Sequence, residues 1–268
     1  MRRAPLSLVP EDDDPQSIQV FANGAIGDEP TRFLIDTGAT TCVVPATAAT
    51  NGLAAAIASA GRGASGTVAD GDVVVLPEIR VGDLVAVDVE ADRLASAPPH
   101  PLLGMNVLGA HACRFRFAAG RIEFDAAQPH SVEPRRPKDD DDVLPFVDLA
   151  VGGYELSACW DTGASRTVVA RSWAEGHPDL VEIDGSSTGH DSAGVVIEAA
   201  TGTFATCAIS GVEFGPSPCV VIDLDALNRH LASPLEIIIG VPLMRAADWW
   251  FDFPNRRWLV QPVDSGGD

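Results

Sequence analysis

Short segments in which apolar and polar residues alternate recur along the whole chain. The alternation is clearest in two segments, with apolar residues at Ile18, Val20 and Ala22 and at Val147, Leu149 and Val151. A period of two is typical of a strand with one buried face. Short β-branched runs separated by Pro, Gly and Asp lie between these segments, at 73–76, 79–81 and 84–89. The pattern therefore predicts mostly strand.

Turn residues divide the later apolar segments into hairpins, and helix signals are few. Two hairpins are predicted, with strand pairs 114–117 and 121–124, and 251–253 and 258–260. One helix is predicted over the alanine-rich segment 45–58, with Pro45 in its first turn. A short helix is expected after each of Gly104 and Gly240. We therefore predict an all-β fold with short helices.

The sequence contains an internal repeat. The segment Phe33-Leu-Ile-Asp-Thr-Gly-Ala-Thr-Thr-Cys-Val-Val44 recurs 125 residues later as Ala158-Cys-Trp-Asp-Thr-Gly-Ala-Ser-Arg-Thr-Val-Val169. A second pair of segments, 102–117 and 238–253, is separated by 136 residues, and each begins with two apolar residues and a glycine. The order of the motifs is the same in both halves, which indicates a duplicated domain with an insertion in the second copy.

A charged, proline-rich segment separates the two copies and is typical of a solvated connector. The acidic cluster from Glu11 to Asp14 is interpreted as a solvated segment as well. The organisation expected from these signals is an N-terminal extension over 1–15, lobe 1 over 16–127, the connector over 128–143, lobe 2 over 144–263 and a tail over 264–268.

The composition limits the partners that we expect. The chain has 38 acidic and 18 basic residues, a net charge of −20, and this surface repels phosphate backbones and anionic lipids. Neither nucleic acid nor a membrane is therefore expected as a partner. No apolar stretch approaches the roughly 18 residues that span a bilayer, and the apolar run after Arg2 and Arg3 soon stops at prolines and acids. We expect a cytoplasmic protein.

Five cysteines are present, and no pair has the spacing of a zinc-binding or redox motif. The odd number and the irregular spacing also argue against a disulfide framework. They are predicted to be small buried apolar residues in a reducing compartment. No metal or other cofactor is expected.

Two copies of Asp-Thr-Gly carry the chemistry that the sequence offers. Asp36 and Asp161 each follow an apolar strand at a sharp turn, and Gly38 and Gly163 allow the backbone to turn and to approach closely. If the two loops face each other, their carboxyl groups form a pair that cannot ionise twice cheaply and that shares one proton. One carboxylate can then take a proton from water while the other donates one to a carbonyl oxygen.

At these residues the chain resembles the retropepsin-like aspartic proteases. In that family Asp-Thr-Gly-Ala-Ser/Thr carries the catalytic aspartate, and Ala39 and Ala164 match its retroviral form more closely than pepsin's Asp-Thr-Gly-Ser. A later apolar-apolar-Gly segment packs behind the aspartate in the family, and here it is matched by the segments that end at Gly104 and Gly240.

The resemblance covers roughly residues 16–126 and 144–262. It implies two retropepsin-like β-barrel lobes fused in one chain, with the active-site cleft between them. It also implies that Thr37 and Thr162 brace the two loops against each other.

The family further implies a flap, a mobile hairpin that closes over the substrate. By position, two Gly-rich segments, 63–71 and 187–195, correspond to it, and the flap candidates are Ser65, Gly66, Thr67, His190, Asp191 and Ser192. His190 is more typical of an idle surface residue than of a pH-sensing one. Pepsins carry a flap tyrosine, whereas the only tyrosine here is Tyr154, just before the second motif.

We predict a monomeric aspartic endopeptidase with Asp36 and Asp161 as its catalytic pair, which binds an extended peptide or protein substrate. A dedicated processing role is one form of this hypothesis. The alternatives are a non-catalytic peptide-binding module with the same fold, a structural role in a larger complex, and a dimer whose lobes pair between chains. Trp249 and Trp250 are expected to pack in the core or between the lobes.

Overall fold

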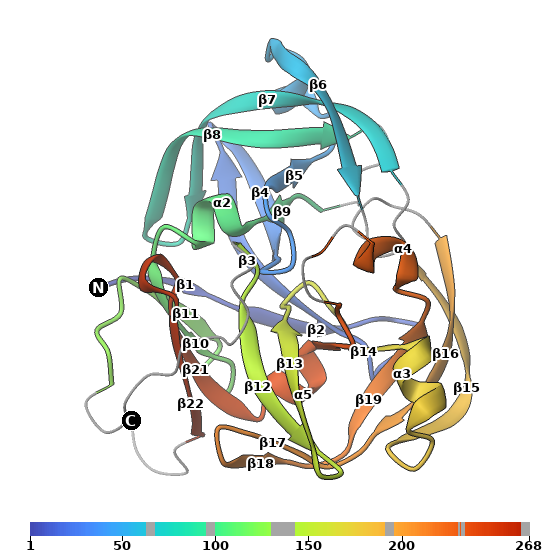
Figure 1. Ribbon diagram of the computed structural model, residues 1–268. Coiled ribbons are helices and arrows are strands. Elements are labelled where there is room, and N and C mark those ends of the chain that lie inside the picture. The colour runs from blue at the N-terminus through green and yellow to red at the C-terminus, as the bar shows by residue number, and fades with distance from the viewer. Residues whose placement is uncertain are drawn as a thin grey trace.

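The computed structural model describes residues 1–62, 68–94, 100–129, 143–190, 196–229, 231 and 234–263. They form mainly strands, arranged in two lobes and a sheet that both lobes share (Figure 1). The all-β prediction and the division into two similar lobes are confirmed.

Lobe 1 is built around an eight-stranded sheet. In chain order its strands are β2 (Ser7–Pro10), β3 (Ile18–Ile26), β4 (Glu29–Ile35), β5 (Cys42–Val44), β6 (Ala55–Arg62), β7 (Val68–Val81), β8 (Leu84–Leu94) and β9 (Leu102–Leu103). They lie in the sheet in the order β2-β3-β4-β9-β5-β8-β7-β6, and β3 also pairs with β7. This additional pairing curls the sheet back on itself.

Lobe 2 is built around a nine-stranded sheet. Its strands are β12 (Phe146–Val151), β13 (Tyr154–Trp160), β14 (Thr167–Ala170), β15 (Val181–His190), β16 (Val196–Phe204), β17 (Cys207–Ile209), β18 (Val212–Phe214), β19 (Ser217–Ile222) and β20 (Ile237–Ile239). The order in the sheet is β15-β16-β19-β14-β20-β13-β12-β17-β18. The parallel pairs β4–β9 and β13–β20 are equivalent in the repeat, and each brings an Asp-Thr-Gly loop beside a later glycine motif.

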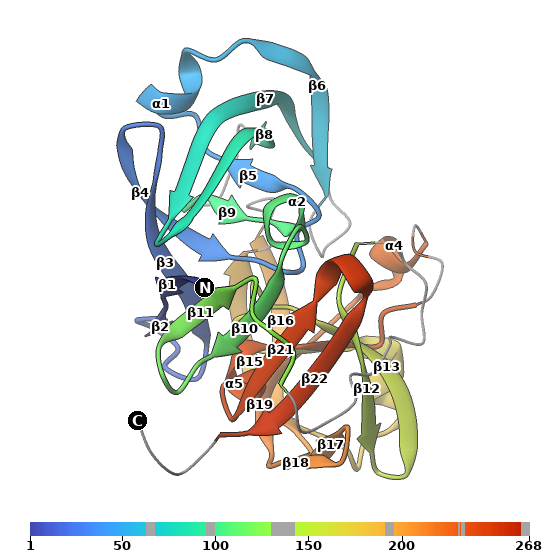
Figure 2. The ribbon, with the colours of Figure 1, turned by 90° about the vertical axis from the view of Figure 1, so that its left-hand side faces the viewer.

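A five-stranded sheet joins the lobes along one side of the molecule (Figures 1 and 2). Its strands, in sheet order, are β1 (Arg2–Pro5), β11 (Arg121–Phe124), β10 (Ala112–Arg116), β21 (Ala247–Asp252) and β22 (Arg257–Pro262). Arg114 and Trp250 are equivalent under the 136-residue offset, and they lie directly opposite each other in the β10–β21 pair. Equivalent strands that pair antiparallel about equivalent residues mark a two-fold axis. The two predicted hairpins are confirmed as β10–β11 and β21–β22.

The helices are short. They are α1 (Ala48–Asn51), α2 (Met105–Leu108), α3 (Arg171–Gly176), α4 (Asp225–Asn228), α5 (Val241–Met244) and the 3₁₀ turn η1 (Phe253–Asn255). The helices expected after Gly104 and Gly240 are confirmed as α2 and α5.

The helix predicted over 45–58 is wrong for most of its length. Only the four residues of α1 are helical, and the chain returns to strand at Ala55 because β6 pairs with β7, for example Ile57 with Val73. Alanine favours helix by a fraction of a kilocalorie per residue, and the hydrogen bonds of a sheet edge override so small a preference. Likewise, the separate runs 73–76 and 79–81 are one strand, β7, in which the exposed Pro77 is accommodated.

Aromatic side chains fill the core where the lobes meet the shared sheet. Trp160 is fully buried and packs against Phe115, Trp249 and Phe251, with ring centroids 4.6–5.5 Å apart. Trp249 and Trp250 are both buried, as predicted. All five cysteines are buried and free, which agrees with their interpretation as small apolar residues.

The predicted N-terminal extension contains β1 and β2, so much of it lies in sheets. The boundaries assigned to the lobes stay a prediction. Most of the predicted connector, 130–142, and the tail, 264–268, lie outside the described residues.

Candidate active site

The two Asp-Thr-Gly loops begin where β4 and β13 end. The Asp36 N–H donates to the carbonyl oxygen of Leu103 at 3.1 Å, and the Asp161 N–H donates to that of Ile239 at the same distance. Each aspartate is therefore held to the short strand of its own lobe, and equivalent bonds hold both. A carboxyl group placed at the end of a buried strand in this way has little freedom to move.

The two threonines exchange hydrogen bonds across the lobes. The Thr37 N–H donates to Thr162 Oγ1 at 3.1 Å, and the Thr162 N–H donates to Thr37 Oγ1 at 3.0 Å. Each hydroxyl then donates to a carbonyl of the opposite lobe, that of Trp160 at 2.8 Å and that of Ile35 at 2.7 Å. Both threonines are fully buried. They therefore tie the two loops together.

The carboxyl groups of Asp36 and Asp161 lie beside each other and share a hydrogen bond. The Gly38 N–H lies 3.0 Å from Oδ1 of both. Asp36 Oδ1 also accepts from the Ala39 N–H at 2.9 Å, and Asp161 Oδ1 accepts from the Gly163 N–H at 2.8 Å. One backbone donor thus contacts both carboxyls, and this donor comes from lobe 1.

The environment of the pair favours retention of a proton. Burial raises the pKa of Asp36 well above its ordinary value, and the charge of Asp161 and the hydrogen bond to it raise the pKa further. Burial also raises the pKa of Asp161, but the Gly163 N–H, the hydrogen bond from Asp36 and the Gly38 N–H oppose this rise. Both shifts favour a proton retained by the pair, and the rise is the larger at Asp36.

The glycines of the two loops are required by this close approach. A Cβ built on Gly38 would lie 2.3–2.6 Å from the Asp161 carboxyl, and one built on Gly163 would lie 2.5–2.8 Å from the Asp36 carboxyl. Each carboxyl group therefore occupies the space that a side chain in the opposite loop would fill.

The later glycine motifs support the loops from behind. The Ala39 carbonyl accepts from the Met105 N–H at 2.8 Å, and the Ala164 carbonyl accepts from the Val241 N–H at 3.0 Å. Gly104 and Gly240 lie so close to the loop backbone that a Cβ on either would come within 2.4 Å of it. The four residues predicted as supporting thus lie in equivalent contacts in the two lobes.

The flap candidates fall on two hairpins. In lobe 1 the hairpin is β6–β7, and the candidates Ser65, Gly66 and Thr67 lie outside the described residues. In lobe 2 the hairpin is β15–β16, and His190 ends β15 opposite Val196. Asp191 and Ser192 also lie outside the described residues. Tyr154 is on β13, where it packs edge-on against His177.

One prominent contact of the site region was missed by the sequence analysis. The buried side chain of Arg166, which follows the second motif, forms an ion pair with Asp14. The interpretation of 11–14 as a solvated segment is therefore wrong for Asp14, and also for Glu11, which hydrogen-bonds Ser165. The only hint in the sequence was the arginine that lobe 2 carries where lobe 1 has Thr41.

In the part of the chain that the structure describes, no three His, Cys, Asp or Glu side chains gather as metal ligands would. No helix in the described part of the chain is long and apolar enough to cross a bilayer.

Comparison with protein families agrees with the duplicated loops. A family model described as aspartyl protease matches the chain twice, over residues 22–107 and 147–243. Each match contains one Asp-Thr-Gly and the later glycine that supports it. The chain belongs to the aspartyl protease family. The two matches fit two fused lobes of the retropepsin-like kind, which confirms the resemblance. A search of curated proteins found no match.

Proposed function

We propose that this chain is an aspartic endopeptidase that hydrolyses peptide bonds with water activated by Asp36 and Asp161. The observation that carries the proposal is the adjacent pair of carboxyl groups, one from each lobe, which the Gly38 N–H joins. Membership of the aspartyl protease family supports the same chemistry.

The unequal environments of the two aspartates suggest a role for each. Asp161, the ionised member, takes a proton from a water molecule as the water oxygen attacks the scissile carbonyl carbon. Asp36, the protonated member, donates its proton to the carbonyl oxygen at the same time. The tetrahedral diol then collapses, the C–N bond breaks, and the leaving nitrogen receives a proton from the pair. No bond between enzyme and substrate is needed.

The substrate that we propose is an extended peptide, held against the hairpins β6–β7 and β15–β16 by added-strand pairing. One chain supplies both aspartates, which supports a monomer as the active form. Size-exclusion chromatography of the active fraction tests this, since elution as a dimer or a hetero-oligomer would contradict it. A processing role in the cytoplasm also remains our proposal. Indiscriminate degradation of casein would contradict a protease dedicated to processing.

The decisive experiment is digestion of a mixed peptide library by the wild type and by Asp36→Asn and Asp161→Asn, with and without pepstatin. We expect each substitution to lower kcat/KM by about 10³-fold or more, because each removes a proton donor or acceptor of the reaction. Asp28→Asn, an exposed aspartate in the β3–β4 turn, is the control and should retain full activity. Retained cleavage in either active-site variant contradicts the paired mechanism, and binding without products favours a peptide-binding module instead.

A further inference from the structure

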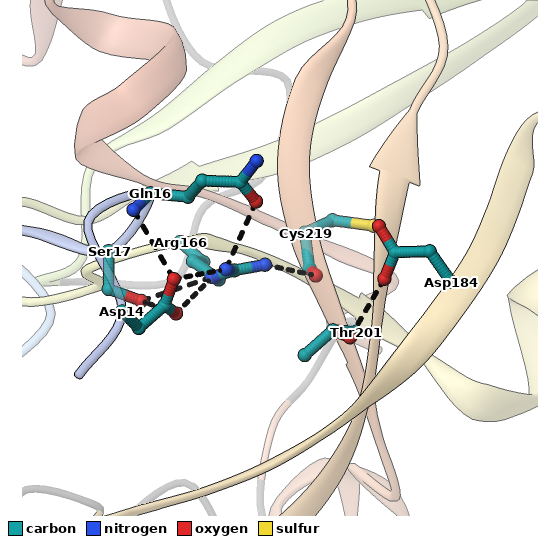
Figure 3. Close-up of polar contacts among 7 residues, drawn as sticks. All are labelled: Asp14, Gln16, Ser17, Arg166, Asp184, Thr201 and Cys219. Carbon is teal, nitrogen blue, oxygen red and sulfur yellow. Dashed lines mark hydrogen bonds and ion pairs between the residues drawn. The ribbon is translucent and has the colours of Figure 1, made fainter.

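The loop between β2 and β3, residues 11–17, reaches across to the active-site loop of lobe 2. Arg166 Nε lies 2.8 Å from Asp14 Oδ2, and Arg166 Nη2 lies 2.5 Å from Asp14 Oδ1, a two-pronged ion pair (Figure 3). The guanidinium also donates to Ser17 Oγ at 3.0 Å and to Gln16 Oε1 at 3.2 Å. It also donates to the Cys219 carbonyl on β19, at 3.5 Å.

Hydrogen bonds within the lobe-1 loop hold the carboxylate that Arg166 contacts. Asp14 accepts from the Ser17 hydroxyl at 2.6 Å and from the Gln16 N–H at 3.2 Å, so the carboxylate is held in place by its own loop. Burial opposes its ionisation, but the hydrogen bonds from Arg166 and Ser17 prevail and keep the pKa of Asp14 below its ordinary value. At neutral pH the ion pair is therefore fully charged.

The backbone of the lobe-2 loop is held at the same place. The Ile18 N–H donates to the Ser165 carbonyl at 2.9 Å. On the other side, the Arg166 carbonyl lies against Gly240, close enough that a Cβ there would come within 2.3 Å of it. Residues 164–167 are thus fixed between a loop of lobe 1 and helix α5 of lobe 2. Asp161, whose carboxylate must face Asp36, is only three residues away from this segment.

Lobe 1 supports its equivalent loop by other means. Thr41 stands where lobe 2 has Arg166, and its hydroxyl donates to Asp92 Oδ2, within the same lobe, at 2.6 Å. Among the described residues, the inter-lobe ion pair therefore braces only the loop of Asp161. Arg166 is 7% exposed, so it depends on this counter-charge, because removal of one partner of a buried ion pair leaves the other charge uncompensated.

We propose that Asp14, Gln16, Ser17 and Arg166 form an inter-lobe latch that positions the active-site loop of lobe 2. Arg166 is then a positioning residue, which acts through the loop that carries Asp161. The catalytic part of this inference rests on the proposed function, whereas the mechanical part, that the latch holds the loop, does not.

The test uses the full chain with Asp14→Asn, which keeps the shape of the side chain and removes its charge. Asp125→Asn is the matched control, because it breaks another ion pair of the N-terminal region, that of Asp125 with Arg2, beside β11. Hydrogen exchange of the segment 161–170 and peptidase kinetics are measured for each variant. Ser17→Ala, which removes one partner of Arg166, is expected to give a smaller effect of the same kind.

For Asp14→Asn we expect exchange in 161–170 to accelerate about tenfold, with β6–β7 unchanged, because a charge-assisted pair has been lost locally. We expect kcat to fall about tenfold while KM stays within about twofold, because the aspartates and not the substrate contacts are displaced. Exchange and kcat equal to those of Asp125→Asn would overturn the latch. Uniformly faster exchange over the whole chain would overturn its positioning role. If the wild type has no peptidase activity, the proposed function fails, and the exchange measurement still decides whether the latch holds the loop.

Discussion

The two active-site loops are alike where they touch each other and different where they touch the rest of the molecule. At the contact, Thr37 and Thr162 exchange equivalent hydrogen bonds, and each glycine leaves room for the opposite aspartate. Behind the contact, lobe 1 uses Thr41 and Asp92 where lobe 2 uses Arg166 and a segment of lobe 1. A residue beside the two-fold axis packs against its own equivalent in the other lobe, whereas a residue away from the axis has surroundings that differ between the lobes, so its counterpart can differ too.

The same contrast appears one residue before each aspartate. Ile35 ends β4, whereas Trp160 ends β13 and inserts its ring among Phe115, Trp249 and Phe251. Even the symmetric contact is electrostatically unequal in the two lobes, because the Gly38 N–H of lobe 1 donates to both carboxyl groups. Symmetric parts should therefore respond equally to equivalent substitutions in the two lobes, and asymmetric parts should not.

Apart from substitution of the aspartates themselves, the largest effect should come from Gly38→Ala and Gly163→Ala. Each new Cβ must displace the carboxyl of the opposite lobe, so we expect both variants to lose about 100-fold in kcat/KM, the typical result of a displacement near 1 Å at a reacting group. Gly215→Ala is the control, because a Cβ there meets no atom within 4 Å. A large loss in only one of the two variants would break the symmetry of the contact.

Removal of either bracing hydroxyl should destabilise the protein to a similar extent. Thr162→Ala leaves the Thr37 N–H without its acceptor and the Ile35 carbonyl without its donor, and each buried group left unpaired costs about 1–3 kcal/mol. Thr37→Ala should cost the same, since its bonds are equivalent. Urea unfolding measures both, and serine at either position should restore most of the stability. Costs that differ several-fold between the two positions would show that the brace is unequal.

The two aspartates should differ in how they affect stability with pH. Folding raises the pKa of Asp36 well above its ordinary value, so the folded state holds this proton more tightly than the unfolded chain does. The stability that this proton provides is complete below the ordinary aspartate pKa of about 3.9. It is lost as the pH rises toward the folded pKa, by about 1.4 kcal/mol for each pH unit that separates the two values. Asp36→Asn should therefore gain stability relative to the wild type between pH 4 and pH 7.

The smaller rise at Asp161 predicts a smaller gain for Asp161→Asn over the same pH range. Thermal unfolding at pH 4 and pH 7 of the two variants and the wild type measures the difference. Equal gains would indicate that the proton is shared evenly and is not held on Asp36.

The smallest effect is expected for Trp160→Phe. The Trp160 Nε1 atom is buried and has no hydrogen-bond partner among the described residues, so loss of this N–H offsets part of the cost of a smaller ring. We expect a change within about 1 kcal/mol in the free energy of unfolding. Trp249→Phe is the comparison, because its Nε1 donates to the Met244 carbonyl at 2.8 Å and that bond would also be lost. A greater loss for Trp160→Phe than for Trp249→Phe would contradict this account.

Much of the active-site region could be predicted from the sequence because its elements are local and duplicated. Asp36 and Asp161, their glycines and the supporting Gly104 and Gly240 stand in short motifs with constant internal spacing. The repeat offset alone placed Arg114 and Trp250 as equivalents, and the shared sheet is centred on that pair. Alternating apolar residues likewise predicted the strands, because successive side chains of a strand point to opposite faces and only one face is buried.

Other features depend on contacts between distant segments, which local patterns do not encode. The alanines of β6 favour helix on their own, and only β7 beside them makes strand the better state. Asp14 looks like part of a solvated acidic run until folding brings it beside Arg166, 152 residues further along the chain. The difference between the two aspartates has the same origin. Two identical Asp-Thr-Gly triplets are equal in sequence, and only burial and the unequal distribution of backbone N–H donors in the folded protein raise the pKa of Asp36 more than that of Asp161.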